Sequence, residues 1–100
     1  MEITHTFIDG TDILMPKGRI DTLTSPELET ALQPLLDKDA VQITLDFKDV
    51  SYISSAGLRI LVKTAQNAKA KNGEVALTNL NESVAQVLEI TGFQSFFKIL

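Results

Sequence analysis

The sequence predicts an α/β fold, a mixed β-sheet of four to five strands with helices packed against it. Strand-like alternation and helix-like spacing of apolar residues follow one another in the order hairpin, helix, strand, helix, strand, helix. The 100 residues are 44% hydrophobic, which suffices for one core, so we expect a single domain over residues 1–100. In open α/β sheets, sites gather where strands end and helices begin.

The first expected elements are two antiparallel strands. Apolar or aromatic side chains alternate on the first strand at Ile3, His5 and Phe7. Asp9-Gly10 supplies the left-handed conformations of a two-residue hairpin turn, and Ile13 and Met15 lie on the returning strand.

A helix is expected to follow this hairpin. Thr24 is placed to cap it, Pro26 suits its first turn, and Glu27 completes a capping box. Its apolar face is then built from residues at helical spacing: Leu28, Ala31, Leu32, Leu35 and Leu36.

The middle of the chain predicts a strand followed by an amphipathic helix. Apolar residues alternate through the segment 41–47, at Val41, Ile43, Leu45 and Phe47. The helix starts near Ser55 and carries one apolar stripe, made of Leu58, Leu61, Val62, Ala65 and Ala68.

The last third predicts a second parallel strand and a third helix. Lys71-Asn72-Gly73 ends the preceding helix, and a short strand covers 75–77. Because strand–helix–strand crossovers are right-handed, the strands near residues 45 and 76 are expected to be parallel neighbours. The third helix runs from a cap at Asn81 to Gly92, and the apolar residues Phe96, Phe97, Ile99 and Leu100 indicate a last short strand or helix.

Composition excludes several classes of function. The chain has no cysteine and one histidine, His5, so disulfides, a zinc ribbon and thiol catalysis are ruled out, and we expect neither a metal nor a cofactor. The net charge of −4 lacks the basic footprint of nucleic-acid binding. No segment approaches the ~20 apolar residues of a membrane span, and no secretory signal is expected. These features favour a cytoplasmic protein whose partner is a protein or a small molecule.

The most informative segment is 46–59, which joins a buried strand to a helix through Ser54-Ser55-Ala56-Gly57. A serine there can cap the helix by accepting backbone N–H bonds from its first turn. The same position also suits a phosphate, because free N–H groups and the helix dipole favour negative charge. Residue physics alone leaves both interpretations open.

This segment resembles the signature of STAS domains, and in particular the single-domain anti-sigma factor antagonists. The family places an aromatic-hydrophobic pair before an aspartate, a phosphorylatable serine, a small hydroxyl residue and a glycine. Here the pair is Tyr52-Ile53, and Ser54, Ser55, Ala56 and Gly57 stand in those four places in turn. Upstream, the segment 18–21 resembles the family's glycine-x-φ-aspartate turn, which ends at Asp21.

The resemblance implies a STAS-like fold and a partner-switching role without catalytic residues. An anti-sigma factor that is also a serine kinase would bind the unmodified domain and phosphorylate Ser55, or as second choice Ser54, using its own ATP and Mg²⁺. A phosphatase of the PP2C type would reverse the modification. The residues expected to meet the partner, with the domain a monomer, are Asp21, Ser54, Ser55, Ala56, Gly57, Arg59 and Lys63.

Two departures from the family pattern leave an alternative. Ser54 removes the charge of the family's aspartate beside the phosphoacceptor, and Ala56 removes a hydroxyl. The alternative is therefore a constitutive STAS scaffold, or an accessory subunit of a transporter or signalling assembly.

Other candidates favour structural roles. Arg59 and Lys63 are ordinary solvated helix charges unless an acidic partner meets them. Asp46 and Asp49 suit capping or solvation better than acid-base catalysis. The chain has neither the nucleophile elbow of an esterase nor a histidine near the serines to act as a base, so an esterase activity is not expected. The phenylalanines at 93, 96 and 97 complete a core more readily than they form a docking patch.

Overall fold

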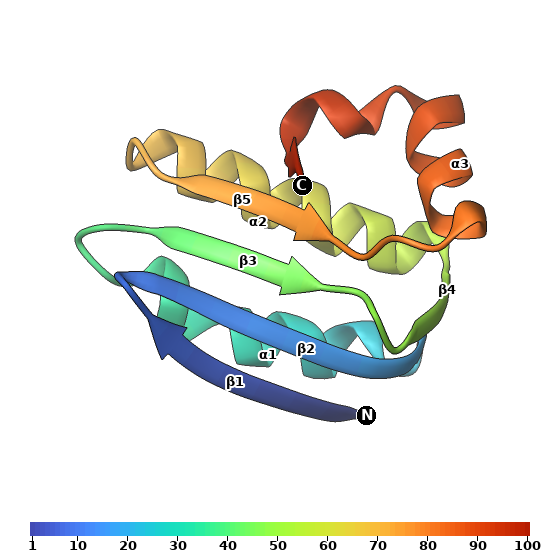
Figure 1. The fold of residues 1–100 in the computed structure, drawn as a ribbon, viewed down its shortest axis with the longest axis horizontal. Coiled ribbons are helices and arrows are strands. Elements are labelled where there is room, and N and C mark those ends of the chain that lie inside the picture. Colours follow the sequence, from blue (N-terminus) through green and yellow to red (C-terminus); the bar gives the residue numbers. More distant parts are fainter.

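The computed structural model describes residues 1–100 and shows a mixed six-stranded sheet with three α-helices (Figure 1). The strand order is β1-β2-β3-β5-β6, and β4 pairs with β2 outside this path. The α/β prediction is confirmed, with six strands in place of the expected four to five.

The predicted hairpin is present. Strand β1 (Glu2–Ile8) pairs antiparallel with β2 (Thr11–Ile20), and Ile8 lies opposite Thr11 at the turn. The turn residues Asp9 and Gly10 have φ angles of 51° and 81°, as a tight hairpin turn requires.

The centre of the sheet is parallel. Strand β3 (Gln42–Asp46) lies between β2 and β5 (Glu74–Thr78), and Leu45 is paired with Leu77. The prediction that the strands near residues 45 and 76 are parallel neighbours is therefore confirmed. The chain ends in a 3₁₀ turn, η1 (Phe93–Phe96), and a short edge strand, β6 (Lys98–Ile99).

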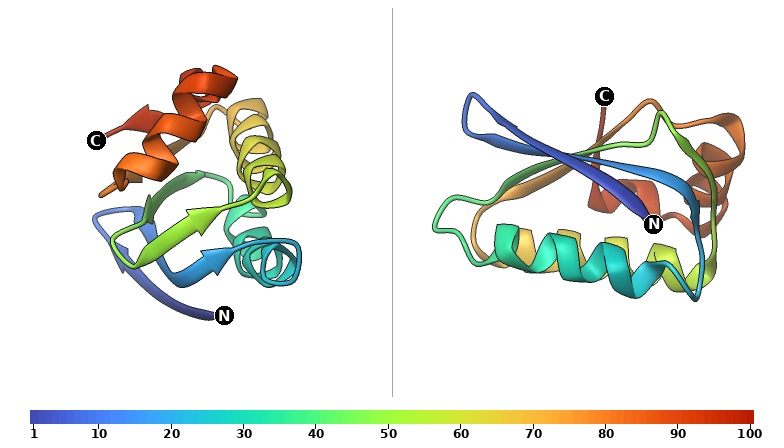
Figure 2. Two further views of the ribbon diagram at one scale, coloured as in Figure 1. Left: turned by 90° about the vertical axis from the view of Figure 1, so that its right-hand side faces the viewer. Right: turned by 90° about the horizontal axis from the view of Figure 1, so that it is seen from below.

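Helices α1 (Ser25–Leu36) and α2 (Ser55–Ala70) lie side by side against one face of the sheet (Figures 1 and 2). Helix α3 (Glu82–Thr91) stands apart from them and contacts β4 (Val50–Ile53) and η1. Asn81 caps α3 and Gly92 ends it in a left-handed conformation, as predicted.

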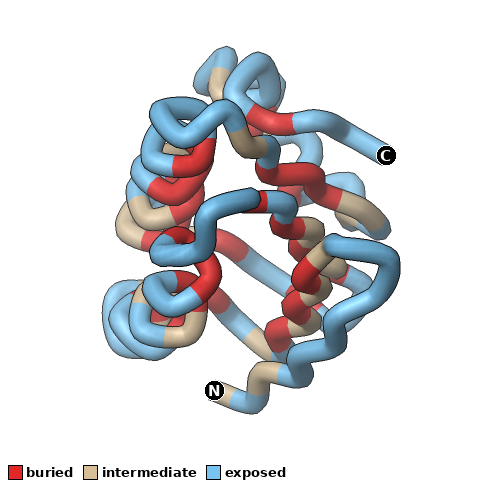
Figure 3. The backbone as a smooth tube through the Cα atoms, turned by 90° about the vertical axis from the view of Figure 1, so that its left-hand side faces the viewer, coloured by how far each residue is buried: buried red, intermediate tan, exposed pale blue.

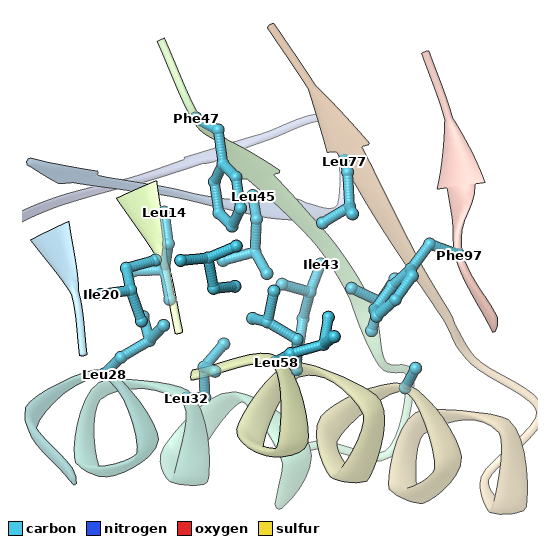
Figure 4. Packing of buried hydrophobic residues seen from close by; sticks show 14 of the residues in the cluster. Leu14, Ile20, Leu28, Leu32, Ile43, Leu45, Phe47, Leu58, Leu77 and Phe97 are labelled. Carbon is cyan, nitrogen blue, oxygen red and sulfur yellow. The ribbon is translucent and has the colours of Figure 1, made fainter. Parts of the chain in front are cut away.

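The core fills the space between the sheet and the α1–α2 pair, and the buried residues lie along the inner faces of these layers (Figures 3 and 4). The helices contribute their predicted apolar stripes, including Leu32 and Leu61. From the sheet side, the side chains of Phe47, Leu45 and Leu77 point into the core, and Phe97 closes its C-terminal side. Burial of Phe97 confirms its predicted core role, whereas Phe96 is exposed.

Strand β4 was not predicted, because segment 46–59 was expected to pass straight from a strand to a helix. Only four residues long, it shows no alternation: Val50 and Ile53 are buried, and the two residues between them are exposed. Its pairing is non-local, with Gly18 opposite Val50 and Ile20 opposite Ile53 on the far end of β2. No local sequence pattern reports such a contact.

The expected capping box of α1 is also wrong. Thr24 precedes the helix, but its side chain makes no capping hydrogen bond. Its hydroxyl donates instead to the carbonyl of Arg19 at 2.7 Å and accepts the N–H of Asp21 at 2.9 Å. Thr24 therefore stabilises the turn between β2 and α1 rather than the helix itself.

Candidate functional site

The two serines of the signature segment have different structural roles. Ser54 is the N-cap of α2, and its Oγ accepts the N–H of Gly57 at 3.2 Å. Ser55 is the first residue of the helix, and its exposed side chain makes none of the hydrogen bonds of the structure. The capping interpretation therefore applies to Ser54, while the Ser55 hydroxyl is free for another partner.

The Gly57 backbone lies behind the surface. A Cβ atom on Gly57 would lie 2.5 Å from Cγ2 of Ile20, 3.0 Å from Cγ1 of Ile53 and 3.2 Å from the Ile20 carbonyl oxygen. Gly57 was among the residues expected to meet the partner, but it is buried. Instead it lets α2 approach β2 and β4, so Gly57 supports the site from below and is no part of its exposed surface.

Strands β2 and β4 bring the two signature segments together. The N–H of Ser54 donates to the Ile20 carbonyl at 2.8 Å, which places the end of β2 against the start of α2. Asp21 follows directly, and its Oδ1 accepts the N–H groups of Thr24 at 3.1 Å and Leu23 at 3.0 Å. The Thr24 N–H, the Leu23 N–H, the Thr24 hydroxyl and the charge of Arg19 outweigh desolvation and lower the pKa of Asp21.

Asp21 thus stays charged near neutral pH, and its hydrogen bonds are made to residues of its own turn. It makes no hydrogen bond to Ser55 in the structure. The structure therefore shows Asp21 stabilising a turn, and the Ser54–Ile20 hydrogen bond places this turn beside the serine pair.

Sequence reasoning missed an aromatic-cationic pair at this edge. The guanidinium of Arg19 lies 4.3 Å from the ring centre of Tyr52, because the two residues are partners in the β2–β4 pairing. Leu23, in the next turn, is 85% exposed. These three residues extend the exposed surface beside Ser54 and Ser55. Tyr52 and Arg19 stood within the signature segments, but only the unpredicted β4 pairing brings them together.

The outer face of α2 carries the two predicted cations. Lys63 Nζ forms an ion pair with Glu29 Oε2 of α1 at 3.0 Å. Arg59 is exposed and takes part in none of the ion pairs of the structure. Arg59 lies on the same helix as Ser55, one turn further along.

The remaining candidates have structural roles. Asp46 accepts hydrogen bonds from the Lys48 N–H and from Asn79 Nδ2, both at 3.0 Å, so it stabilises the turn after β3 and caps no helix. No group of three or more histidine, aspartate or glutamate side chains is arranged to hold a metal ion. No helix is long and apolar enough to span a bilayer.

Comparisons with known proteins give matches over nearly the whole chain. The STAS domain model matches residues 2–100. The chain is 35% identical over 99 residues to BtrV of Bordetella bronchiseptica, described as an anti-sigma factor antagonist, covering 99% of this chain and 85% of that protein. It is also 35% identical over 82 residues to the anti-sigma-B factor antagonist of Bacillus subtilis, covering 82% of this chain and 74% of that protein.

Solved structures show the same fold. A crystal structure of an anti-sigma factor antagonist from Thermotoga maritima superposes with a TM-score of 0.88 at 26% identity, covering 97% of this chain and 84% of that chain. The unphosphorylated form of the antagonist SpoIIAA has a TM-score of 0.77 at 14% identity, which shows the fold alone, and covers 99% of this chain and 87% of that chain. Signature segments, fold and relatives agree, and this chain belongs to the STAS domain family.

Proposed function

We propose that this protein is an anti-sigma factor antagonist that works by partner switching. Unmodified, it binds an anti-sigma factor that is also a serine kinase; phosphorylated on Ser55, it is released, and a phosphatase of the PP2C type restores it. The observation that carries the proposal is the exposed, unbonded hydroxyl of Ser55 at the start of α2. The proposal is supported by two relatives, each 35% identical to this chain, whose names describe them as anti-sigma factor antagonists.

The position of Ser55 explains how a phosphate would change binding without unfolding the domain. The phosphate carries about −1.5 to −2 charges and would lie beside the free N–H groups and positive dipole end of α2. Because Ser54 supplies the cap, modification of Ser55 would leave the Ser54–Gly57 hydrogen bond in place. A docked interface would meet new negative charge and the cost of desolvating it.

The partner surface that we propose surrounds Ser55. It consists of the exposed or half-exposed residues Asp21, Ser54, Ser55, Ala56, Arg59 and Lys63, extended by Arg19, Leu23 and Tyr52. ATP and Mg²⁺ would be bound by the kinase, so this domain needs no cofactor of its own. We expect the domain to act in the cytoplasm as a monomer, which binds its partner through this surface.

Intact-protein mass spectrometry of the chain from its own host tests the modification. Peptide mapping of residues 52–63 is expected to place one phosphate on Ser55 under some growth conditions. In matched variants, Ser55→Ala should lose the phosphate and Ser54→Ala should keep it. Protein that stays unmodified in every condition, or a phosphate on Ser54, would contradict the proposal.

The missing aspartate supports a second candidate function. With Ser54 in place of the family's aspartate, no carboxylate flanks the phosphoacceptor within the signature. A kinase that requires that charge would not act here, and the domain would then serve as a constitutive scaffold or as an accessory subunit of a transporter or signalling assembly. Co-purification with one assembly at fixed stoichiometry, unchanged by Ser55→Ala, would favour this role.

A further inference from the structure

Helix α2 and the corner formed by α3 and η1 enclose an open groove of about 540 Å³ that begins at Ser55. Figure 1 shows α2 and the α3–η1 corner as neighbours. The groove has an apolar floor and a polar rim, and its lining residues are Ser55, Leu58, Arg59, Val62, Lys63, Gln66, Thr91 and Phe93.

The charge of this groove is opposite to that of the whole molecule. The chain has a net charge of −4, yet the lining contains two cations and no acidic residue. Lys63 is already neutralised by Glu29 at 3.0 Å. Arg59 is the cation of the groove that has no ion-pair partner, and it is exposed.

Ser55 and Arg59 are four residues apart on the same helix. Such residues are neighbours on the helix surface, with about 5–6 Å between their Cβ atoms. A negative group that precedes a positive one at this spacing is the more favourable order, since it also agrees with the helix dipole. Arginine can bind phosphate with two parallel N–H···O bonds.

We propose that Arg59 is the internal counter-ion of a phosphate on Ser55, and that in the modified protein its guanidinium lies across the Ser55 end of the groove. The inference rests on the proposed function, since it concerns the phosphorylated state of the same site. In the unmodified protein Arg59 is free to bind a carboxylate of the partner. Phosphorylation therefore acts twice: it adds negative charge, and it withdraws this arginine from the partner surface.

The test measures the ionisation of the phosphate itself. Phosphoserine is placed at position 55 of the full-length chain by genetic encoding, and ³¹P NMR follows its second ionisation, whose pKa is normally about 6. A cation beside the phosphate favours the dianion and lowers this pKa. Arg59→Gln is expected to raise the pKa by about 0.3 pH unit relative to the otherwise unmutated phosphoprotein at low salt.

Lys63→Gln provides the matched control, because Lys63 lines the same groove but lies eight residues, about 12 Å along the helix, from Ser55. This variant should leave the phosphate pKa unchanged, and Arg59→Lys should give a smaller shift than Arg59→Gln because the charge is retained. A concentration of 1 M salt should reduce the difference caused by Arg59→Gln.

Two results would overturn the inference: an identical titration in Arg59→Gln, or an equal shift in Lys63→Gln, which would indicate a general field rather than a specific pair. Because the phosphoserine is encoded, neither result depends on a kinase. Failure of this test therefore leaves the proposed function standing, and absence of phosphate in the host leaves this test intact.

Discussion

Ser54 and Ser55 have identical side chains, and one step along the chain separates a structural role from an exposed one. Ser54 satisfies the N–H of Gly57, whereas the Ser55 hydroxyl is unbonded. Ser54→Ala should therefore lower the free energy of unfolding by about 1 kcal/mol through loss of the cap. Ser55→Ala should change it by less than about 0.5 kcal/mol, as for other exposed positions. Urea denaturation of the two variants measures this difference, and the reverse order would show that Ser55 is the true cap.

At Gly57, at the base of the site, close packing and helix propensity have opposite effects on the stability of an alanine variant. A Cβ atom there would overlap Cγ2 of Ile20, and the nearby Ile20 carbonyl belongs to the backbone of β2. Although alanine is the better helix former, we expect Gly57→Ala to destabilise the domain by about 1–3 kcal/mol through overpacking. Thermal and urea unfolding would show it, and unchanged or increased stability would mean that α2 can move away from β2 at little cost.

The elements differ in how far the sequence predicted them. The hairpin and the three helices follow from local patterns, namely a turn dipeptide and apolar stripes, and the parallel β3–β5 pair follows from the crossover rule applied to two locally predicted strands. Strand β4 has no such pattern, because its four residues are specified by pairing with the far end of β2. The Arg19–Tyr52 contact and the role of Gly57 depend on that pairing, so they could not be predicted either. The serine pair could be located because its signature is local.

A second consequence of tertiary pairing is the buried carboxylate of Asp12 on β2. It accepts hydrogen bonds from Lys38 Nζ at 2.8 and 3.0 Å, and His5 Nε2 of β1 lies 2.8 Å away. The Asp12 side chain is 3% exposed, whereas the side chains of Lys38 and His5 are 41% and 44% exposed. Asp12 thus ties β1, β2 and the segment after α1 together.

Asp12→Asn should lower the free energy of unfolding at neutral pH by about 1–2 kcal/mol, with solvent at Lys38 and His5 moderating the loss. Burial alone would raise the pKa of Asp12, but the hydrogen bonds and charges of Lys38 and His5 outweigh it, and the pKa lies below its ordinary value of 3.8. A lowered pKa contributes stability that is present above pH 3.8 and is lost as the pH falls through the folded-state pKa.

Urea denaturation across pH 2–7 is expected to show wild type and Asp12→Asn converging at the acid end. Asp39→Asn, at an exposed carboxylate next to Lys38, is the control and should follow wild type throughout. A constant difference between wild type and Asp12→Asn at all pH values would mean that packing, rather than charge, explains the loss.

At the scale of the whole molecule, strand β2 separates two polar centres. The first centre is Asp12, near the start of β2. The second is the serine pair, which is bound to the end of β2 by the hydrogen bond from the Ser54 N–H to the Ile20 carbonyl. Eight residues of strand at ~3.3 Å each place these centres roughly 25 Å apart. Between them lies the closely packed apolar core, to which Leu14, Leu45 and Leu77 of three neighbouring strands contribute (Figure 4). One end of the sheet therefore stabilises the hairpin, and the other presents Ser55.

Such a separation predicts that changes at the two ends are independent. Effects of substitutions more than about 10 Å apart add within about 0.5 kcal/mol when no partner is shared. The double variant Asp12→Asn with Ser54→Ala should therefore lose the sum of the two single losses, as measured by urea denaturation at pH 7. A coupling energy above about 1 kcal/mol would contradict this independence and would mean that β2 transmits strain between the hairpin and the start of α2. Additivity would instead mean that the hairpin end can be altered to tune stability while the surface around Ser55 stays as it is.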